Sequence, residues 1–285
     1  MNKQKHPAKF FNKAEILILI LVASAVLSAC GKSEDTIRAY PEETEEATEE
    51  SDAAAETGIA AGLYIVIDPG HGFDDVGTQS GYTQEDEYYY TLLYSEEIAE
   101  KLESYGATAV LTHDGETYPD EDELTRLVAE YGITFSSENV KATAGDNLFN
   151  KYERVMYTSV LNYENGVDFF LSVHFNSYDT DETYGTAVFY YEDNPEAELC
   201  DTFADYVMEK TGYPTNYNGI YSMDYEDAYA VIKYGDYAGA LIECAFMTNA
   251  SDAANIESET WRDQMTDYIV YSMIYALTGV DLAEE

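Results

Sequence analysis

The feature that most constrains this chain is an alternation, from Leu63 onward, of short apolar runs with segments of helical periodicity. The runs are rich in β-branched and aromatic residues, and the first of them stops at Asp68-Pro69-Gly70, which is typical of a buried strand that ends in a turn. Strands that alternate with helices predict an α/β fold. We expect a single domain on a twisted, mostly parallel or mixed sheet of about five to six strands, flanked by helices on both faces. The expected strands cover residues 64–67, 109–112, 168–173, 187–191 and 240–243.

Helical spacing of apolar residues follows most of these runs. Helices are predicted over 87–104, 147–163, about 195–211 and about 260–277. The stretch 114–146 is different, because it is acidic, contains Gly and Pro, and has only a weak helical signal near 124–129. An excursion of this length is often a rim or lid over a site, and it can equally be a dispensable surface loop.

The first thirty residues resemble a secretion signal. Four lysines precede the apolar run 16–22, which is shorter than the roughly 20 residues that a membrane-spanning helix needs. The sequence Leu27-Ser28-Ala29-Cys30-Gly31 resembles a bacterial lipobox, so Cys30 is the predicted lipidation site. We therefore expect a lipoprotein signal peptide over 1–29, an acidic disordered tether over 30–60 and a folded domain over 61–280, held outside the cytoplasm at the membrane by the lipid anchor.

Composition excludes two classes of protein. The chain has 14 Lys and Arg against 56 Asp and Glu, a formal net charge of −42. Phosphates would be repelled by this surface, which excludes general binding of nucleic acid. The 3 Cys residues are too few for a disulfide framework. Cys200 and Cys244 could pair, or each could be a small core residue.

Three titratable residues stand at the ends of predicted strands. His71 follows the first strand directly, and His174 follows the third. Because parallel strands end at the same edge of a sheet, two imidazoles so placed can converge on a metal, and a third ligand would come from Glu85, Asp86 or Glu87. Glu243 closes an otherwise apolar run, where a carboxylate is costly to desolvate unless it is functional or paired.

These segments, in this order, resemble the zinc-dependent N-acetylmuramoyl-L-alanine amidases, the catalytic domain of bacterial autolysins. The similarity runs from about Leu63 to Leu277 and rests on four motifs. The motifs are Ile65-Val66-Ile67-Asp68-Pro69-Gly70-His71-Gly72, then Arg154, then Phe170-Leu171-Ser172-Val173-His174-Phe175-Asn176, and then Leu241-Ile242-Glu243 through Phe246 and Asn249.

The resemblance implies a role for each of these residues. His71, Glu87 and His174 would bind Zn²⁺, with Glu85 as the alternative to Glu87, and Glu243 would be the catalytic residue. Substrate binding is expected of Arg154 and Asn176, although Asn176 could equally be a turn residue. The chain departs from the family pattern at Phe73, Thr91 and His113. We expect His113 to be a surface residue rather than an extra ligand.

The resemblance also implies an activity, the hydrolysis of the amide bond between N-acetylmuramic acid and L-alanine in peptidoglycan. Two alternatives remain, another zinc peptidase of peptidoglycan and a non-catalytic, wall-binding relative. The predicted partners are peptidoglycan and, through Cys30, the membrane, while the oligomeric state stays undetermined.

Overall fold

The computed structural model describes residues 58–135 and 149–284. The predicted signal peptide, Cys30 and nearly all of the predicted tether lie outside these residues. So do residues 136–146 of the predicted excursion and the first two residues of the helix expected to begin at Asn147. In the described part of the chain, no helix is both long and apolar enough to cross a membrane.

A six-stranded sheet forms the centre of the molecule, in the order β2-β1-β3-β6-β4-β5. The strands β2, β1, β3 and β6 are parallel to one another, β4 runs antiparallel to β6, and β5 is parallel to β4. The sheet is thus mixed and mostly parallel, as the alternation of elements predicts. The strands are β1 (Tyr64–Pro69), β2 (Thr108–Leu111), β3 (Phe169–Asn176), β4 (Ala187–Tyr191), β5 (Ile220–Met223) and β6 (Gly239–Phe246).

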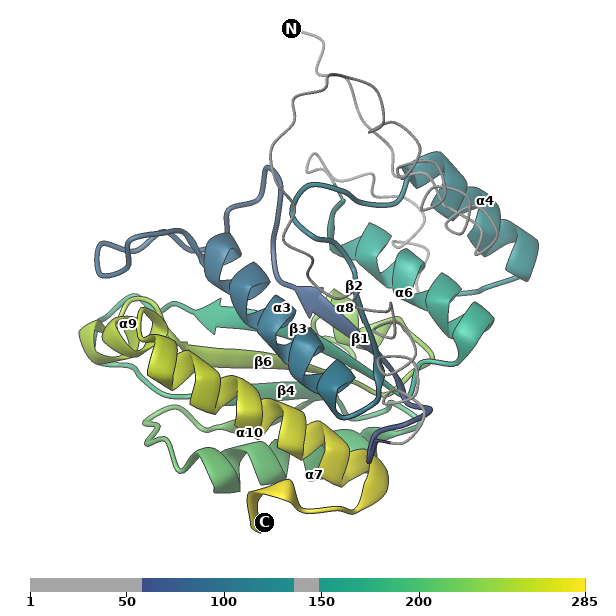
Figure 1. Ribbon diagram of the computed structural model, residues 1–285. Coiled ribbons are helices and arrows are strands. Elements are labelled where there is room, and N and C mark those ends of the chain that lie inside the picture. Colours follow the sequence, from purple (N-terminus) through teal and green to yellow (C-terminus); the bar gives the residue numbers. More distant parts are fainter. Residues whose placement is uncertain (1–57, 136–148, 285) are drawn as a thin grey trace, which may run out of the picture.

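Helices cover both faces of the sheet (Figure 1). One face is covered by α3 (Glu87–Ser104), α7 (Ala197–Thr211) and α10 (Glu259–Thr278), with α9 (Ala250–Ile256) just before α10. The other face carries α6 (Lys151–Asn165) and the short α8 (Ala230–Lys233), and α4 (Glu121–Tyr131) packs on the outside of α6. A 3₁₀ turn, η2 (Leu282–Glu284), follows α10.

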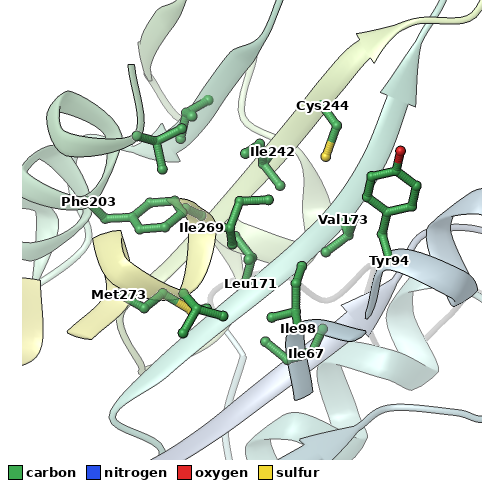
Figure 2. Packing of buried hydrophobic residues seen from close by; sticks show 14 of the residues in the cluster. Ile67, Tyr94, Ile98, Leu171, Val173, Phe203, Ile242, Cys244, Ile269 and Met273 are labelled. Carbon is green, nitrogen blue, oxygen red and sulfur yellow. The ribbon is translucent and has the colours of Figure 1, made fainter. Parts of the chain in front are cut away.

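Alternation of side chains along the strands produces a separate core on each face. Ile67 and Leu171 point to the face of α3, α7 and α10, where they pack with Phe203 and Ile269 (Figure 2). Ile65 belongs to the same core. Their neighbours Val66 and Phe170 point to the other face and pack against α6 and α8. This two-residue period follows from strand geometry. It also places the even-numbered side chains at the end of β3 on the α6 and α8 face.

The predicted elements are confirmed with a few differences. The helix over 87–104 is α3, the strand over 187–191 is β4, and the weak signal at 124–129 belongs to α4. The helix expected from Asn147 begins only at Lys151, because Asn150 caps it and Glu153 completes a capping box. No strand or helix was predicted for β5, α8 or α9. Cys200 and Cys244 are both buried and unpaired, which matches the core alternative.

Candidate functional site

The loop after β1 places His71 at the carboxyl edge of the sheet. His71 and Phe73 have left-handed backbone conformations, with φ of 65° and 59°. The loop closes on itself through two hydrogen bonds between the backbones of Gly72 and Asp75, at 2.8 and 3.0 Å. Its later part caps α3, since the carbonyls of Thr78 and Val76 accept from the amides of Glu87 and Tyr88. The sequence after the first strand therefore brings His71 close to the first residue of α3.

Glu87 lies between the two histidines. Its Oε1 is 3.1 Å from Nε2 of His71 and 3.2 Å from Nδ1 of His174. Backbone amides of Thr78 and Phe175 donate to the two oxygens of this carboxylate, at 2.9 and 3.1 Å. Only 4% of the Glu87 side chain is exposed, so the four contacts fix a buried carboxylate.

The register of the sheet places His174 beside Glu243. The two residues are direct partners on the parallel strands β3 and β6, and both side chains point to the face of α6 and α8. The Oε2 atom of Glu243 is buried and has no hydrogen-bond partner among the described residues. An unpartnered buried carboxylate oxygen calls for an explanation, such as a role in chemistry.

Three ligand atoms of these residues form a group that could hold a metal. One atom each from His71, Glu87 and His174 lies within 4.8 Å of the others. Two imidazole nitrogens and a carboxylate oxygen suit zinc and leave a fourth position for water or substrate. The donor set and its spacing thus fit a catalytic zinc site.

Burial and mutual charge shift the titration of this group. Burial raises the pKa of Glu87, but hydrogen bonds from His174 and His71 outweigh it and hold the pKa well below its usual range. Burial lowers the pKa of His174, against the opposing effect of Glu87. Burial, together with the charge of Glu87, raises the pKa of Glu243 well above its usual range. The pKa values of the Glu87 and Glu243 carboxyl groups are therefore shifted in opposite directions. This is expected where one carboxylate binds a cation and the other exchanges protons.

A cavity of about 550 Å³ opens over this group. Its lining includes all four of these residues, His71, Glu87, His174 and Glu243, together with the start of α6 and the start of α8. Its volume lies in the range of ligand sites in proteins. The described part of the predicted excursion, residues 114–135, contributes no residue to its lining, because α4 packs against α6 instead.

The other predicted site residues lie in or near the cavity. Asn176 lines it from the last position of β3, so it is a strand residue and the turn alternative is wrong. Arg154 also borders it but is 5% exposed, and its Nη1 donates to backbone carbonyls. Whether either residue binds substrate stays a prediction. Glu85, the alternative ligand, is exposed and lies outside the metal-binding group.

Sequence reasoning did not predict several residues of the cavity wall, among them Asp75, Lys151 and Tyr229. Asp75 places Oδ2 3.1 Å from Nδ1 of His71, and its position four residues after that histidine was the available signal. Lys151 is a cation at the start of α6 in a strongly acidic chain. Tyr229 is 42% exposed, but one tyrosine among 28 carries no signal of its own.

The site also requires the absence of a side chain at Gly70. A Cβ atom there would lie 2.3 Å from Cε1 and 2.5 Å from Nε2 of His174. We expect Gly70→Ala to displace the imidazole and to lower zinc affinity by about tenfold or more, since a displaced ligand loses its geometry. Zinc titration against a chromogenic chelator measures this, with Gly81→Ala as the control, because a Cβ at Gly81 meets nothing within 4 Å. Equal affinities in the two variants would contradict the steric argument.

Comparison with known proteins identifies the relatives of this domain. The family model Amidase_3, N-acetylmuramoyl-L-alanine amidase, matches residues 65–275. The probable cell wall amidase LytH of Staphylococcus aureus is 24% identical over 221 residues, which are 77% of this chain and 60% of LytH. The chain thus spans less than two thirds of the length of that relative.

Solved structures show the same fold. The N-acetylmuramoyl-L-alanine amidase of Clostridium difficile 630 superposes with a TM-score of 0.54 at 22% identity, over 75% of this chain and 96% of that one. The amidase AmiC2 of Nostoc punctiforme gives 0.55 at 22% identity, over 75% and 97%. With a family model that matches most of the chain, this protein belongs to the N-acetylmuramoyl-L-alanine amidase family.

Proposed function

We propose that this protein hydrolyses the amide bond between N-acetylmuramic acid and L-alanine in peptidoglycan. The observation that carries the proposal is the unpartnered carboxylate of Glu243 on the wall of a cavity, next to a His-Glu-His group with the spacing of metal ligands. Family membership supports the choice of bond, and the relative named a cell wall amidase supports the substrate class.

His71, Glu87 and His174 are the proposed ligands of a zinc ion. Nε2 of His71 and Nδ1 of His174 both lie within 3.2 Å of Oε1 of Glu87. The backbone amides of Thr78 and Phe175 hold this carboxylate in place. A bound zinc ion would polarise the scissile carbonyl and lower the pKa of a water. The three proposed ligand residues would hold the ion at the edge of the cavity, within reach of a bound substrate.

Glu243 is the proposed acid and base of the reaction. Its carboxylate would accept a proton from the attacking water and deliver that proton to the leaving nitrogen of L-alanine. The raised pKa of this carboxyl suits both steps, because a stronger base accepts the proton and the acid so formed is present near neutral pH. Asn176 and Arg154 border the same cavity and are proposed to contact the substrate or the loops that hold it.

The activity can be tested by identifying the products of wall digestion. The purified full chain is incubated with zinc and peptidoglycan, and the soluble products are analysed by mass spectrometry. We expect stem peptides that begin with a free L-alanine amino group and glycan that keeps intact lactyl groups. A chelator should stop the release, and added zinc should restore it.

Other outcomes would favour the alternatives. Cleavage within the stem peptide, with L-alanine still attached to muramic acid, would identify a peptidase and refute the amidase proposal. Zinc binding without release from walls of several stem-peptide chemistries would favour a wall-binding relative. Both outcomes are distinguished from a misfolded preparation by cooperative thermal unfolding of the same sample.

We also propose that the domain acts outside the cytoplasm, tethered to the membrane by a lipid on Cys30. The lipobox-like sequence and the acidic stretch after it support this arrangement, as does the relative named a cell wall amidase. Incorporation of labelled fatty acid into the wild-type chain and not into Cys30→Ser tests the anchor.

A further inference from the structure

The loop that carries His71 has a costly backbone conformation. His71 and Phe73 both have positive φ, and neither is a glycine. A left-handed conformation is sterically unfavourable for a residue that has a Cβ atom. Such conformations persist only where the surroundings determine them, and they often occur at functional sites.

Three polar side chains hold the carbonyl groups at the start of this loop. The carbonyl of Pro69 lies 2.7 Å from Nη1 of Arg154 and 3.0 Å from Nε2 of His113. Thr91 donates its hydroxyl to the carbonyl of Gly70 at 2.7 Å. Nη1 of Arg154 also reaches the carbonyl of His71, at 3.4 Å. The carbonyls of Pro69, Gly70 and His71 are thus all fixed by side chains. Thr91 belongs to α3, Arg154 belongs to α6, and His113 follows β2.

The three donors are buried, and each has a carbonyl of the loop within hydrogen-bond distance. The hydroxyl of Thr91 also lies 3.0 Å from the carbonyl of Tyr88 in its own helix, farther than the 2.7 Å to Gly70. Thr91 is fully buried, His113 is 3% exposed and Arg154 is 5% exposed. The prediction that His113 lies on the surface is therefore wrong. A carbonyl oxygen only accepts hydrogen bonds, so Nε2 of His113 must donate to the carbonyl of Pro69. Neutral His113 therefore carries its proton on Nε2. Burial lowers the pKa of His113, which favours this neutral form.

We propose that Arg154, Thr91 and His113 form a carbonyl clamp, a set of positioning residues that hold His71 in its metal-binding conformation. The proposal rests on the proposed function, because it assigns to His71 the role of zinc ligand. Removal of a group that hydrogen-bonds to a metal ligand and fixes its orientation commonly changes metal affinity by about 10–100-fold. The clamp acts on the backbone of the ligand, whereas Oδ2 of Asp75 lies 3.1 Å from Nδ1 of its imidazole.

Zinc affinity of the purified full chain tests the clamp. Thr91→Val removes the hydroxyl with little change of volume, and we expect the Kd for zinc to rise about 10–100-fold. Thr91→Ser restores the hydroxyl and should restore the Kd. A second variant, His113→Leu, should weaken zinc binding through the Pro69 carbonyl and is independent of Thr91. At saturating zinc, Thr91→Val should regain the kcat of the wild type, because the clamp acts through affinity.

Thr266→Val is the matched control. Thr266 is also fully buried and hydrogen-bonded, but it lies on α10 and contacts Glu97. The Thr266→Val variant should have a lower stability than the wild type and the same Kd for zinc. Wild-type Kd values in both Thr91→Val and His113→Leu would overturn the clamp and leave the proposed function intact. A wild-type chain that binds no zinc would overturn the zinc site itself, and a chain that binds zinc but cleaves no wall would overturn only the activity.

Discussion

Glu243→Gln should lower kcat for wall hydrolysis by about 10²- to 10⁴-fold, the usual contribution of a positioned acid and base. Glutamine has nearly the same size and keeps an oxygen, but it can neither take a proton from water nor deliver one to the leaving nitrogen. Glu243 is not among the proposed ligands, so the Kd for zinc should change little. Release of stem peptides, followed by mass spectrometry at saturating zinc, measures the rate.

A loss of rate in Glu243→Gln must be distinguished from a loss of zinc binding or of folding. Glu198→Gln is a suitable control, because Glu198 is exposed in the first turn of α7, on the opposite face of the sheet. It should keep the wild-type rate. A Glu243→Gln variant that binds zinc normally and retains more than about a tenth of the wild-type kcat would contradict the assignment of Glu243. Excess zinc should not rescue this variant, in contrast to Thr91→Val.

The convergence of the site was predictable because it depends on parallel strands. Apolar runs locate β1, β3 and β6, and parallel strands present their carboxyl ends at one edge. Two histidines that follow two such runs can then lie near each other, and they do so here because β1 and β3 are neighbours in the sheet. The register of β3 and β6, with His174 beside Glu243, could not be read from the sequence, because it depends on how the whole sheet is assembled.

Other elements were not predictable for local reasons. The segment that forms β5 and α8 is rich in tyrosine and polar residues, and α8 has four residues, too few to show a helical period. For α6, the apolar spacing extended past the true start of the helix, although Asn150 and Glu153 form a capping pair that was legible in the sequence.

The environment of single polar residues was the least predictable feature. His113 follows a short strand near the edge of the sheet, where a surface position is the ordinary expectation. It is buried because Phe73, Tyr88 and Phe149 surround its ring. These contacts join segments far apart in the chain, and no local pattern encodes them. The contacts of Arg154 with the loop of His71 were not predictable either, since its backbone partners lie 83 or more residues away.

Asp68→Ala should lower the free energy of unfolding by about 3–5 kcal/mol, the cost of breaking a buried ion pair from one side. Asp68 is fully buried in β1 and accepts from Oγ1 of Thr112 and Oγ of Ser172, each at 2.7 Å. It also lies 3.4 Å from Nη1 of Arg154. The alanine variant leaves the guanidinium buried without a counter-charge. Urea unfolding in the presence of a chelator measures the loss without any contribution from metal binding.

Two further variants separate the causes of that loss. Asp263→Ala removes an acid that is 65% exposed and pairs with Lys101, and such surface pairs contribute about 0–1 kcal/mol. Asp68→Asn keeps an acceptor oxygen but loses the charge, so its stability should lie between those of the wild type and Asp68→Ala. If Asp68→Asn were as stable as the wild type, hydrogen bonding alone would account for the contribution of Asp68 to stability. A lower stability shows that the site needs the whole carboxylate, because asparagine loses both the charge beside Arg154 and one of the two acceptor oxygens. The two oxygens of Asp68 accept from Thr112 and Ser172, and Oδ1 also lies against the guanidinium that fixes the loop of His71.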